Sequence, residues 1–156
     1  VAARRWDVYK DPFEDDGHLD EYINATSGHL MWTAARLLGT AEEMVVRDYA
    51  YAVGVANIFQ AYPALIAQDR KPLIDGSDQS VKDLARQAAA RLEMACESYR
   101  SVSKEAGFAL VAGYHAKRVL RQVTASPVRV TEDNLDVNPA RDSLRFANVS
   151  LRGWWR

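Results

Sequence analysis

Cysteine is nearly absent from this sequence, because Cys96 is the only one in 156 residues. A disulfide framework within the chain is therefore excluded, and a reducing compartment is indicated. The sequence also lacks the roughly 18 uninterrupted apolar residues that a membrane span requires, and no signal peptide is visible. We therefore expect a cytoplasmic protein whose contact with a membrane, if any, is peripheral.

The sequence also has no excess of positive or negative charge, and it has no phosphate-binding loop. The 20 Lys and Arg residues nearly balance the 21 Asp and Glu residues, and the net charge is −1. This balance argues against a protein that binds nucleic acid by neutralising its phosphates. The eight glycines are scattered, so the sequence has no Gly-rich loop of the kind that holds a nucleotide.

What remains is a composition of 48% hydrophobic and 26% charged residues, typical of a globular domain. Apolar residues recur at helical spacing and no segment alternates like a strand, so we predict an all-α fold in a single domain over residues 1–156. The expected helices cover residues 18–38, 81–106, 108–124 and 139–151, together with a central helix that starts at Thr40 and has Pro63 inside its last turns. Irregular segments are expected over 68–79 and 128–137.

The most apolar stretch, from Thr40 to Leu73, is expected to form the central helix. Thr40-Ala-Glu-Glu43 predicts a capping box at its start. Pro63 is expected to kink or end the helix nearby, because proline cannot donate a backbone hydrogen bond. Small residues between these points allow a neighbouring helix or a ligand to approach the backbone: Ala50, Ala52, Gly54 and Ala56.

The flanking helices have their own predicted contacts. The apolar stripe of residues 18–38 includes Leu19, Ile23, Leu30, Met31 and Leu37. Asn138-Pro139 predicts a cap followed by proline at the first helical position of the last helix. The residues of that helix expected to contact the rest of the chain are Leu144, Ala147, Val149 and Leu151.

The chain begins at Val1 rather than Met, and residues 1–9 are more typical of the end of a helix than of its start. We therefore expect a fragment of a longer helical bundle. A half bundle leaves one apolar face of its central helix uncovered, and exposed apolar surface favours association. A homo-oligomer or a protein partner is the expected consequence.

Candidate chemical groups are few, and each has an ordinary structural explanation. His18, His29 and His115 show no metal-ligand spacing, and Cys96 is expected to be a buried small hydrophobe. The pairs Asp15-Asp16 and Asp20-Glu21 are explained by a helix start. Two clusters keep two interpretations each. The cations Lys117, Arg118 and Arg121 form a solvated face or an anion site, and Trp154-Trp155 packs on the core or anchors the chain to a membrane or partner.

Several motifs, in order, resemble those of the squalene/phytoene synthase family. They are Tyr22-x5-Gly28 with Met31, Gly54-Val-Ala-Asn57-Ile58-Phe59, Arg70-Lys-Pro-Leu73, Gly113-Tyr114 through Leu120, and Pro127 with residues 138–155. The resemblance covers nearly the whole chain and about the second half of a family member. It implies an all-α bundle of the isoprenoid synthase type around a large apolar pocket.

Family enzymes join two prenyl diphosphates head to head, with Mg²⁺ held by two aspartate-rich motifs. The second motif follows Asn-Ile-x-Arg-Asp, with another Asp one helical turn later. Here Asn57 and Ile58 match, whereas Gln60 replaces the arginine, and Ala61 and Leu65 replace the aspartates. The chain is therefore more similar to the family's non-catalytic branch, which resembles complex I assembly factors.

The resemblance thus implies a non-catalytic binding or assembly factor without cofactor, catalytic residues or metal ligands. We expect an isoprenoid or lipid ligand and a protein partner or second copy, but no nucleic acid. The alternative is a head-to-head prenyltransferase, a prenyl diphosphate synthase that uses Mg²⁺ held by upstream carboxylates. The apolar groove is expected to be lined by Tyr22, Met31, Tyr51, Gly54, Asn57 and Ile58.

Overall fold

The computed structural model describes residues 13–135 and 138–155, and over this part of the chain it is an all-α bundle. The predicted all-α class is therefore confirmed, while the helix end expected over residues 1–9 lies outside the described residues. The elements are α1 (Asp16–Ile23), η2 (Asn24–Gly28), α2 (His29–Leu38), α3 (Glu43–Ile66), α4 (Asp78–Glu97), η3 (Tyr99–Ser101), α5 (Lys104–Leu110), η4 (Val111–Gly113), α6 (Ala116–Ala125), α7 (Val128–Thr131) and α8 (Pro139–Arg152).

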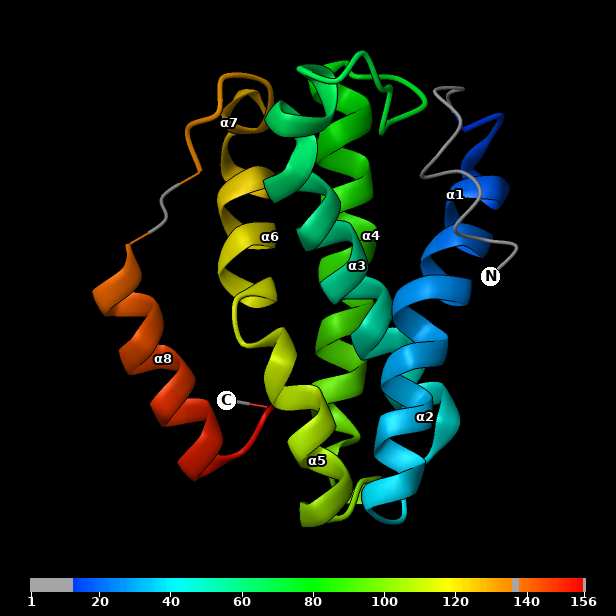
Figure 1. Ribbon diagram of the computed structural model, residues 1–156, viewed down its shortest axis with the longest axis vertical. Coiled ribbons are helices and arrows are strands. Elements are labelled where there is room, and N and C mark those ends of the chain that lie inside the picture. Colours follow the sequence, from blue (N-terminus) through cyan, green and yellow to red (C-terminus); the bar gives the residue numbers. More distant parts are fainter. Residues whose placement is uncertain (1–12, 136–137, 156) are drawn as a thin grey trace.

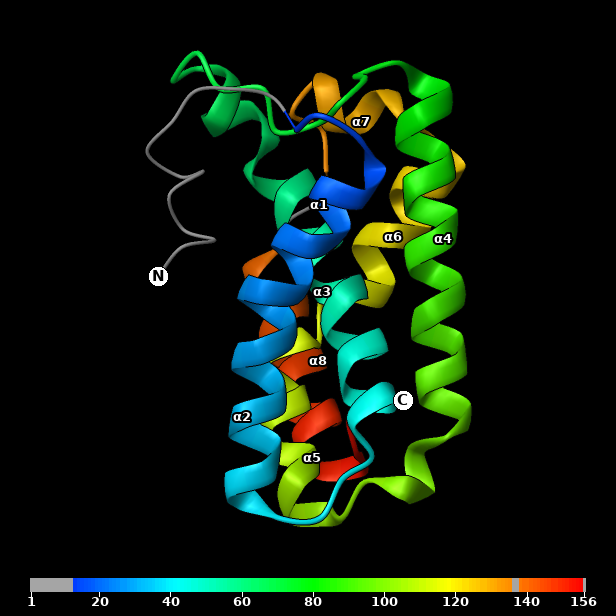
Figure 2. The same cartoon turned by 90° about the vertical axis from the view of Figure 1, so that its right-hand side faces the viewer.

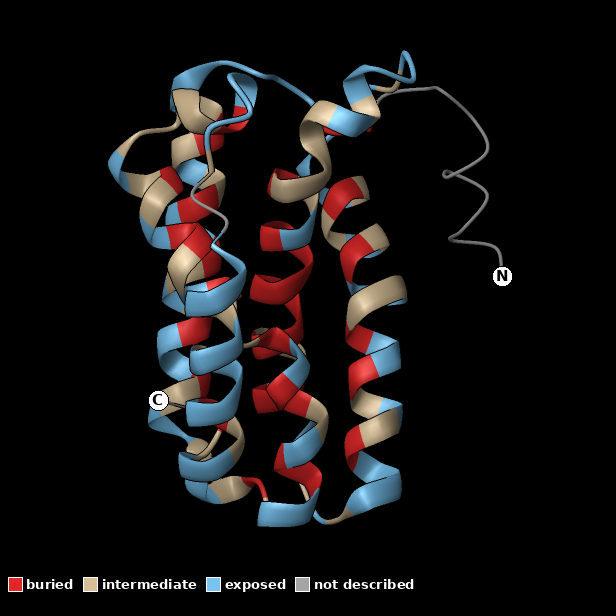
Figure 3. Cartoon of the chain, turned by 60° about the vertical axis from the view of Figure 1, so that its left-hand side comes forward, coloured by how far each residue is buried: buried red, intermediate tan, exposed pale blue. Residues whose placement is uncertain are grey.

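Helix α3 is the central element of the bundle. It lies between α4 and the column formed by α1, η2 and α2, while α5 and α6 form a further column beside it (Figures 1 and 2). Nearly every residue of α3 from Val45 to Ala56 is buried (Figure 3). The prediction of an uncovered apolar face on the central helix is therefore wrong for these residues, because neighbouring helices cover it on all sides.

The start of α3 differs from the predicted capping box. Its N-cap residue is Glu42, whose side chain makes no capping hydrogen bond. Thr40 is instead part of an extended segment, and its carbonyl accepts from the amide of Ser103 at 2.8 Å. The carboxylate of Glu43 pairs with Arg47 at 2.6 Å. A tertiary backbone pairing has thus replaced the local cap.

The helix predicted over residues 18–38 forms, but with a turn of π-helix, η2, in its middle. A π-turn adds a residue to one helical turn, so the buried face shifts by one position after it. Leu19 and Ile23 are buried as predicted, whereas Leu30 and Leu37 are 71% and 83% exposed. Met31 is buried, also as predicted, and Ala35 faces the core in place of Leu37.

The single helix expected over residues 81–106 is two helices. It ends at Glu97, and α5 begins after Ser103, whose hydroxyl accepts from the amide of Ala106 at 3.2 Å. Gly107, which lies between two of the expected helices, is inside α5, and its missing side chain makes room for Trp154. The expected loop before α4 is correct, and Ser77 caps that helix by accepting from the amide of Ser80.

The C-terminal part follows the predictions more closely. The helix expected over residues 108–124 is interrupted at η4, and the segment expected to be irregular contains the short α7. Asn138 caps α8 by accepting from the amide of Arg141 at 3.1 Å. Of the residues predicted to contact the body, Val149 is buried, whereas the other three are exposed: Leu144, Ala147 and Leu151.

The tryptophan pair after α8 packs against the body of the bundle. Trp154 is buried with its ring 5.0 Å from that of Tyr49, and Trp155 stacks on Tyr99 at 4.6 Å. Of the two interpretations of this pair, core packing is therefore correct. Pro63 lies inside α3, which continues to Ile66, and the last turns of α3 lean away from the rest of the helix (Figure 2).

Candidate functional site

The first candidate site is a pocket of about 290 Å³ between the α1–η2 column and the second half of α3. We call it the apolar pocket. Its size is at the lower end of the range for small-molecule sites, roughly 300–1,000 Å³. Its described lining residues are Phe13, Tyr22, Ile23, Thr26, Ser27, Gly54, Asn57, Ile58, Ala61, Leu65, Arg70 and Pro72.

Gly54 sets the distance between the two walls of the apolar pocket. A Cβ atom at this position would lie 2.6 Å from Cγ2 of Ile23 and 3.0 Å from Oγ of Ser27. Only glycine allows η2 to approach α3 this closely. The small residue singled out in the sequence therefore brings a helix, rather than a ligand, against the backbone, and the pocket opens beside that contact.

The polar groups of the apolar pocket are few and are held in place. The hydroxyl of Thr26 donates to the carbonyl of Tyr22 at 2.7 Å. The side-chain oxygen of Asn57 lies 2.9 Å from Nε2 of His115, so the pocket's rim is tied to the start of α6. Burial, and then the positive charge of Arg118, lower the pKa of His115, which favours the neutral imidazole in this hydrogen bond.

Ala61 and Leu65 lie one helical turn apart on α3, and both line the apolar pocket. These are the positions at which the resemblance places the two magnesium-binding aspartates. A methyl group and an isobutyl group offer no oxygen to a cation, so this wall is suited to an apolar chain. The described lining includes no carboxylate, and Arg70 is its only charged residue.

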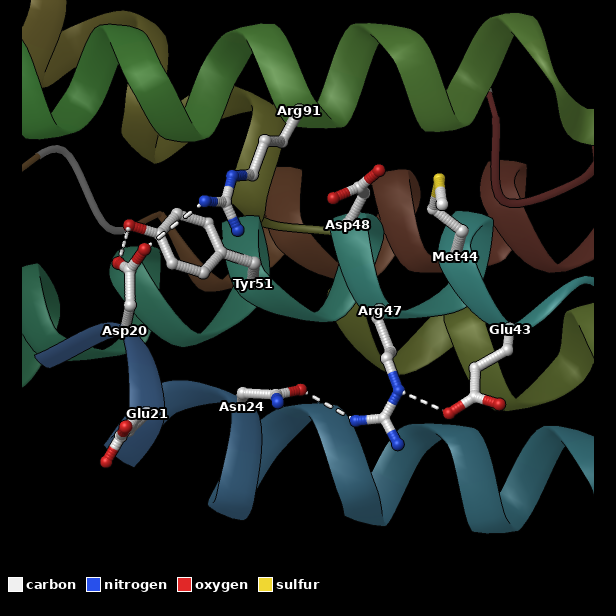
Figure 4. Close-up of a pocket in the computed structure, with 9 residues that line it drawn as sticks. All are labelled: Asp20, Glu21, Asn24, Glu43, Met44, Arg47, Asp48, Tyr51 and Arg91. Carbon is white, nitrogen blue, oxygen red and sulfur yellow. Dashed lines mark hydrogen bonds and ion pairs between the residues drawn. The ribbon is translucent and has the colours of Figure 1, made fainter. Parts of the chain in front are cut away.

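A second cavity of about 610 Å³ lies beside the first half of α3, and we call it the polar cleft (Figure 4). The hydroxyl of Tyr51 donates to one oxygen of Asp20 at 2.6 Å, and Arg91 donates to the other at 3.2 Å. The guanidinium of Arg91 also lies over the Tyr51 ring, 3.9 Å from its centre. These contacts join α1, α3 and α4.

A second set of contacts crosses the polar cleft nearby. Arg47 donates to Asn24 and to Glu43, each at 2.6 Å, and so joins η2 to the start of α3. Asp48 points into the cleft without a hydrogen bond to any described residue (Figure 4). Burial raises the pKa of Asp48, and the charge of Arg91 opposes this effect.

The structure brings together four of the six residues predicted to form a groove, namely Tyr22, Gly54, Asn57 and Ile58. Tyr51 is on the same face of α3 but nearer its start, where it lines the polar cleft. Met31 lines neither cavity, because it is buried in the core on the α2 side. Sequence reasoning did not assign the rest of the pocket lining, although Arg70 belongs to one of the motifs on which the resemblance rests.

The remaining candidates have structural roles. Arg118 pairs with Asp142 at 3.2 Å and thereby joins α6 to α8, whereas Lys117 and Arg121 are exposed. Cys96 is half-buried against the core, and burial raises the pKa of its thiol. Among residues 13–135 and 138–155, no three His, Cys, Asp or Glu side chains are grouped in a way that could hold a metal ion.

Membrane-spanning helices were also sought in the described part of the chain. None of its helices combines the length and the apolar composition that crossing a bilayer requires. A scan against protein-family models, a search of curated proteins and a search of solved structures each returned no match.

Proposed function

We propose that this protein is a non-catalytic helical binding protein whose apolar pocket holds an isoprenoid or similar lipid chain. The observation that carries the proposal is the wall formed by Ile58, Ala61 and Leu65, which faces Tyr22 and Ile23 across the pocket. Apolar walls with a few polar groups at the rim are typical of small-molecule sites. The volume of about 290 Å³ favours a short chain.

The resemblance to the squalene/phytoene synthase family favours an isoprenoid over other apolar ligands. Its motifs contribute Tyr22, Gly54 and Asn57 to the same pocket. Because Ala61 and Leu65 stand where the family has aspartates, the protein is expected to bind the prenyl chain without ionising a diphosphate. A role as an assembly factor with a protein partner is consistent with binding without turnover.

The test is calorimetric titration of the purified protein with farnesol and with farnesyl diphosphate, each with and without Mg²⁺. We expect farnesol to bind and Mg²⁺ to have no effect. Ala61→Phe places a ring in the apolar pocket and is expected to weaken farnesol binding about tenfold or more. Ala64→Phe is the matched control, because Ala64 is exposed on the same turn of α3, and it should leave the affinity unchanged.

Two results would contradict the proposal. Turnover of farnesyl diphosphate that depends on Mg²⁺ would favour the alternative, a head-to-head prenyltransferase. Equal loss of farnesol binding in the Ala61→Phe and Ala64→Phe variants would show that the ligand does not occupy the apolar pocket.

A further inference from the structure

Helix α8 presents three distinct faces along its 14 residues. Its inner face holds it to the bundle: Asp142 pairs with Arg118, the ring of Phe146 meets that of Tyr114 at 5.5 Å, and Val149 is buried. These residues are separated by four and three positions and so share one side of the helix. The contacts of the inner face attach α8 to the bundle, and they do not involve the residues on the opposite side of the helix.

The opposite side is an apolar strip that the fold leaves uncovered. Leu144 is 72% exposed and Leu151 is 86% exposed, more than any other large apolar side chain among the described residues except Leu37. The spacing places all members of the strip on one face. We call this face the α8 outer strip, which consists of Ala140, Leu144, Ala147 and Leu151.

A row of arginines runs beside the α8 outer strip. Arg141, Arg145 and Arg152 are four and seven residues apart, so they also share one face of the helix. Asp142 is the only acidic residue of α8, and it is turned inward and paired with Arg118. The charged side chains that α8 itself carries next to the exposed leucines are therefore all basic, although the whole chain has a net charge of −1.

We propose that the α8 outer strip is a contact surface for an anionic membrane. A helix about 21 Å long with leucines on one face and arginines beside them can lie in the interface plane. Its leucines then enter the boundary between head groups and acyl chains while its arginines meet anionic phosphates. This inference is independent of the apolar pocket, so either proposal can fail without the other.

The outer side of α2 provides an internal comparison. Leu30 and Leu37 are as exposed as the leucines of α8. Arg36 is the only basic residue of α2 besides His29, so this face lacks a row of cations. The row of arginines therefore distinguishes the α8 outer strip from the exposed leucines of α2.

The test is flotation of the purified protein with vesicles of phosphatidylcholine alone or with about 30 mol% phosphatidylglycerol. We expect flotation only with the anionic vesicles, and release as NaCl is raised from about 0.1 to about 0.5 M. The double substitution L144S/L151S and the triple substitution R141Q/R145Q/R152Q should each reduce the bound fraction at least about fivefold. The matched control, L30S/L37S on α2, should float like the unaltered protein.

Circular dichroism and sedimentation velocity of the same variants check folding and association. The altered side chains are mostly solvent-exposed, so we expect native helix content in all of them. The proposal is overturned if the protein does not float with anionic vesicles, or if L30S/L37S reduces binding as much as L144S/L151S. It is also overturned if the protein sediments as a dimer that L144S/L151S dissociates, because a second copy then covers the strip.

Discussion

The two cavities along α3 share two of their walls, but the side chains that line them differ in polarity. Both have residues of α3 and of the α1–η2 column in their lining, and α4 adds Arg91 to the polar cleft. In the polar cleft, Asp20, Tyr51 and Arg91 satisfy one another. In the apolar pocket, Ala61 and Leu65 face the space with groups that have no hydrogen bonds to make.

Because of this difference, the larger cavity is not the better candidate for binding an apolar ligand. The polar cleft is the larger, yet most of its charged groups already have partners, and a ligand would have to replace contacts that join three helices. An apolar chain that enters the apolar pocket does not have to break hydrogen bonds or ion pairs of Ala61 and Leu65, and it removes apolar surface from water. We therefore propose a structural role for the polar cleft and ligand binding for the apolar pocket.

The largest expected effect on stability and on farnesol binding comes from a substitution that pushes η2 away from α3. In Gly54→Leu, the added Cβ atom would lie only 2.6 Å from Cγ2 of Ile23, so the two helices must move apart. We expect it to lower the free energy of unfolding by about 3 kcal/mol and to abolish farnesol binding. Urea denaturation measures the first effect and calorimetry the second.

The control for this substitution is Ala64→Leu, which places the same leucine side chain at an exposed position of α3. It should change stability by no more than about 0.5 kcal/mol. Full stability of Gly54→Leu would mean that η2 and α3 are not in close contact at this point, and the comparison of two cavities would lose its basis.

A smaller effect is expected from the polar cleft. Tyr51→Phe removes the hydroxyl that donates to Asp20 at 2.6 Å and leaves the ring beneath Arg91. We expect a loss of about 1–2 kcal/mol in urea denaturation, because the acceptor is charged. Farnesol affinity should not change. A large drop in affinity with unchanged stability would reverse the assignment of the two cavities.

The matched control is Tyr62→Phe, because Tyr62 is half-buried on the same helix and no hydrogen bond of its hydroxyl is seen among the described residues. A change within about 0.5 kcal/mol is expected. An equal loss in both variants would assign the effect to packing rather than to the Asp20 contact.

The smallest effect concerns Asp48, a partly buried carboxylate of the polar cleft without a hydrogen-bond partner among the described residues. Burial raises its folded-state pKa above 3.8, so the folded protein binds a proton more readily than the unfolded chain. Stability from this group falls as the pH rises from about 3.8 through the folded-state pKa. Asp48→Asn should therefore raise the melting temperature at pH 7 by about 1 °C.

This gain should shrink as the pH is lowered through the folded-state pKa of Asp48, because the carboxyl group then becomes protonated in the folded protein. Glu21→Gln is the control, since Glu21 lines the same cleft and is exposed. Scanning calorimetry at several pH values measures both variants. A decrease in melting temperature for Asp48→Asn at pH 7 would indicate that the carboxylate stabilises the cleft through Arg91.

Local signals in the sequence predicted several features correctly. Asn138-Pro139 marked the start of α8, and the apolar run of α3 marked the central helix, because caps and burial leave direct traces in composition. The small residue Gly54 and its neighbours Asn57 and Ile58 were also correctly placed together. Helical spacing alone places residues that are one or two turns apart on the same face of a helix, and this does not depend on the rest of the fold.

Other features depend on contacts between distant segments. The π-turn at η2 moved Leu30 and Leu37 out of the buried face and brought Ala35 into it, and no residue pattern in the sequence announces that shift. The pairing of Thr40 with Ser103 replaced a sound local capping box. Tyr51 shares a face with Gly54, but its partners Asp20 and Arg91 come from other helices, and they assign it to the polar cleft.

The most direct test of the central claim is methyl NMR during titration of the isotope-labelled protein with farnesol. The methyl groups of Ile58 and Leu65 report on the apolar pocket, and that of Met44 reports on the polar cleft. We expect the Ile58 and Leu65 signals to shift in a saturable way while the Met44 signal stays in place. Shifts confined to Met44, or no saturable shift at Ile58 and Leu65, would contradict the assignment of ligand binding to the apolar pocket.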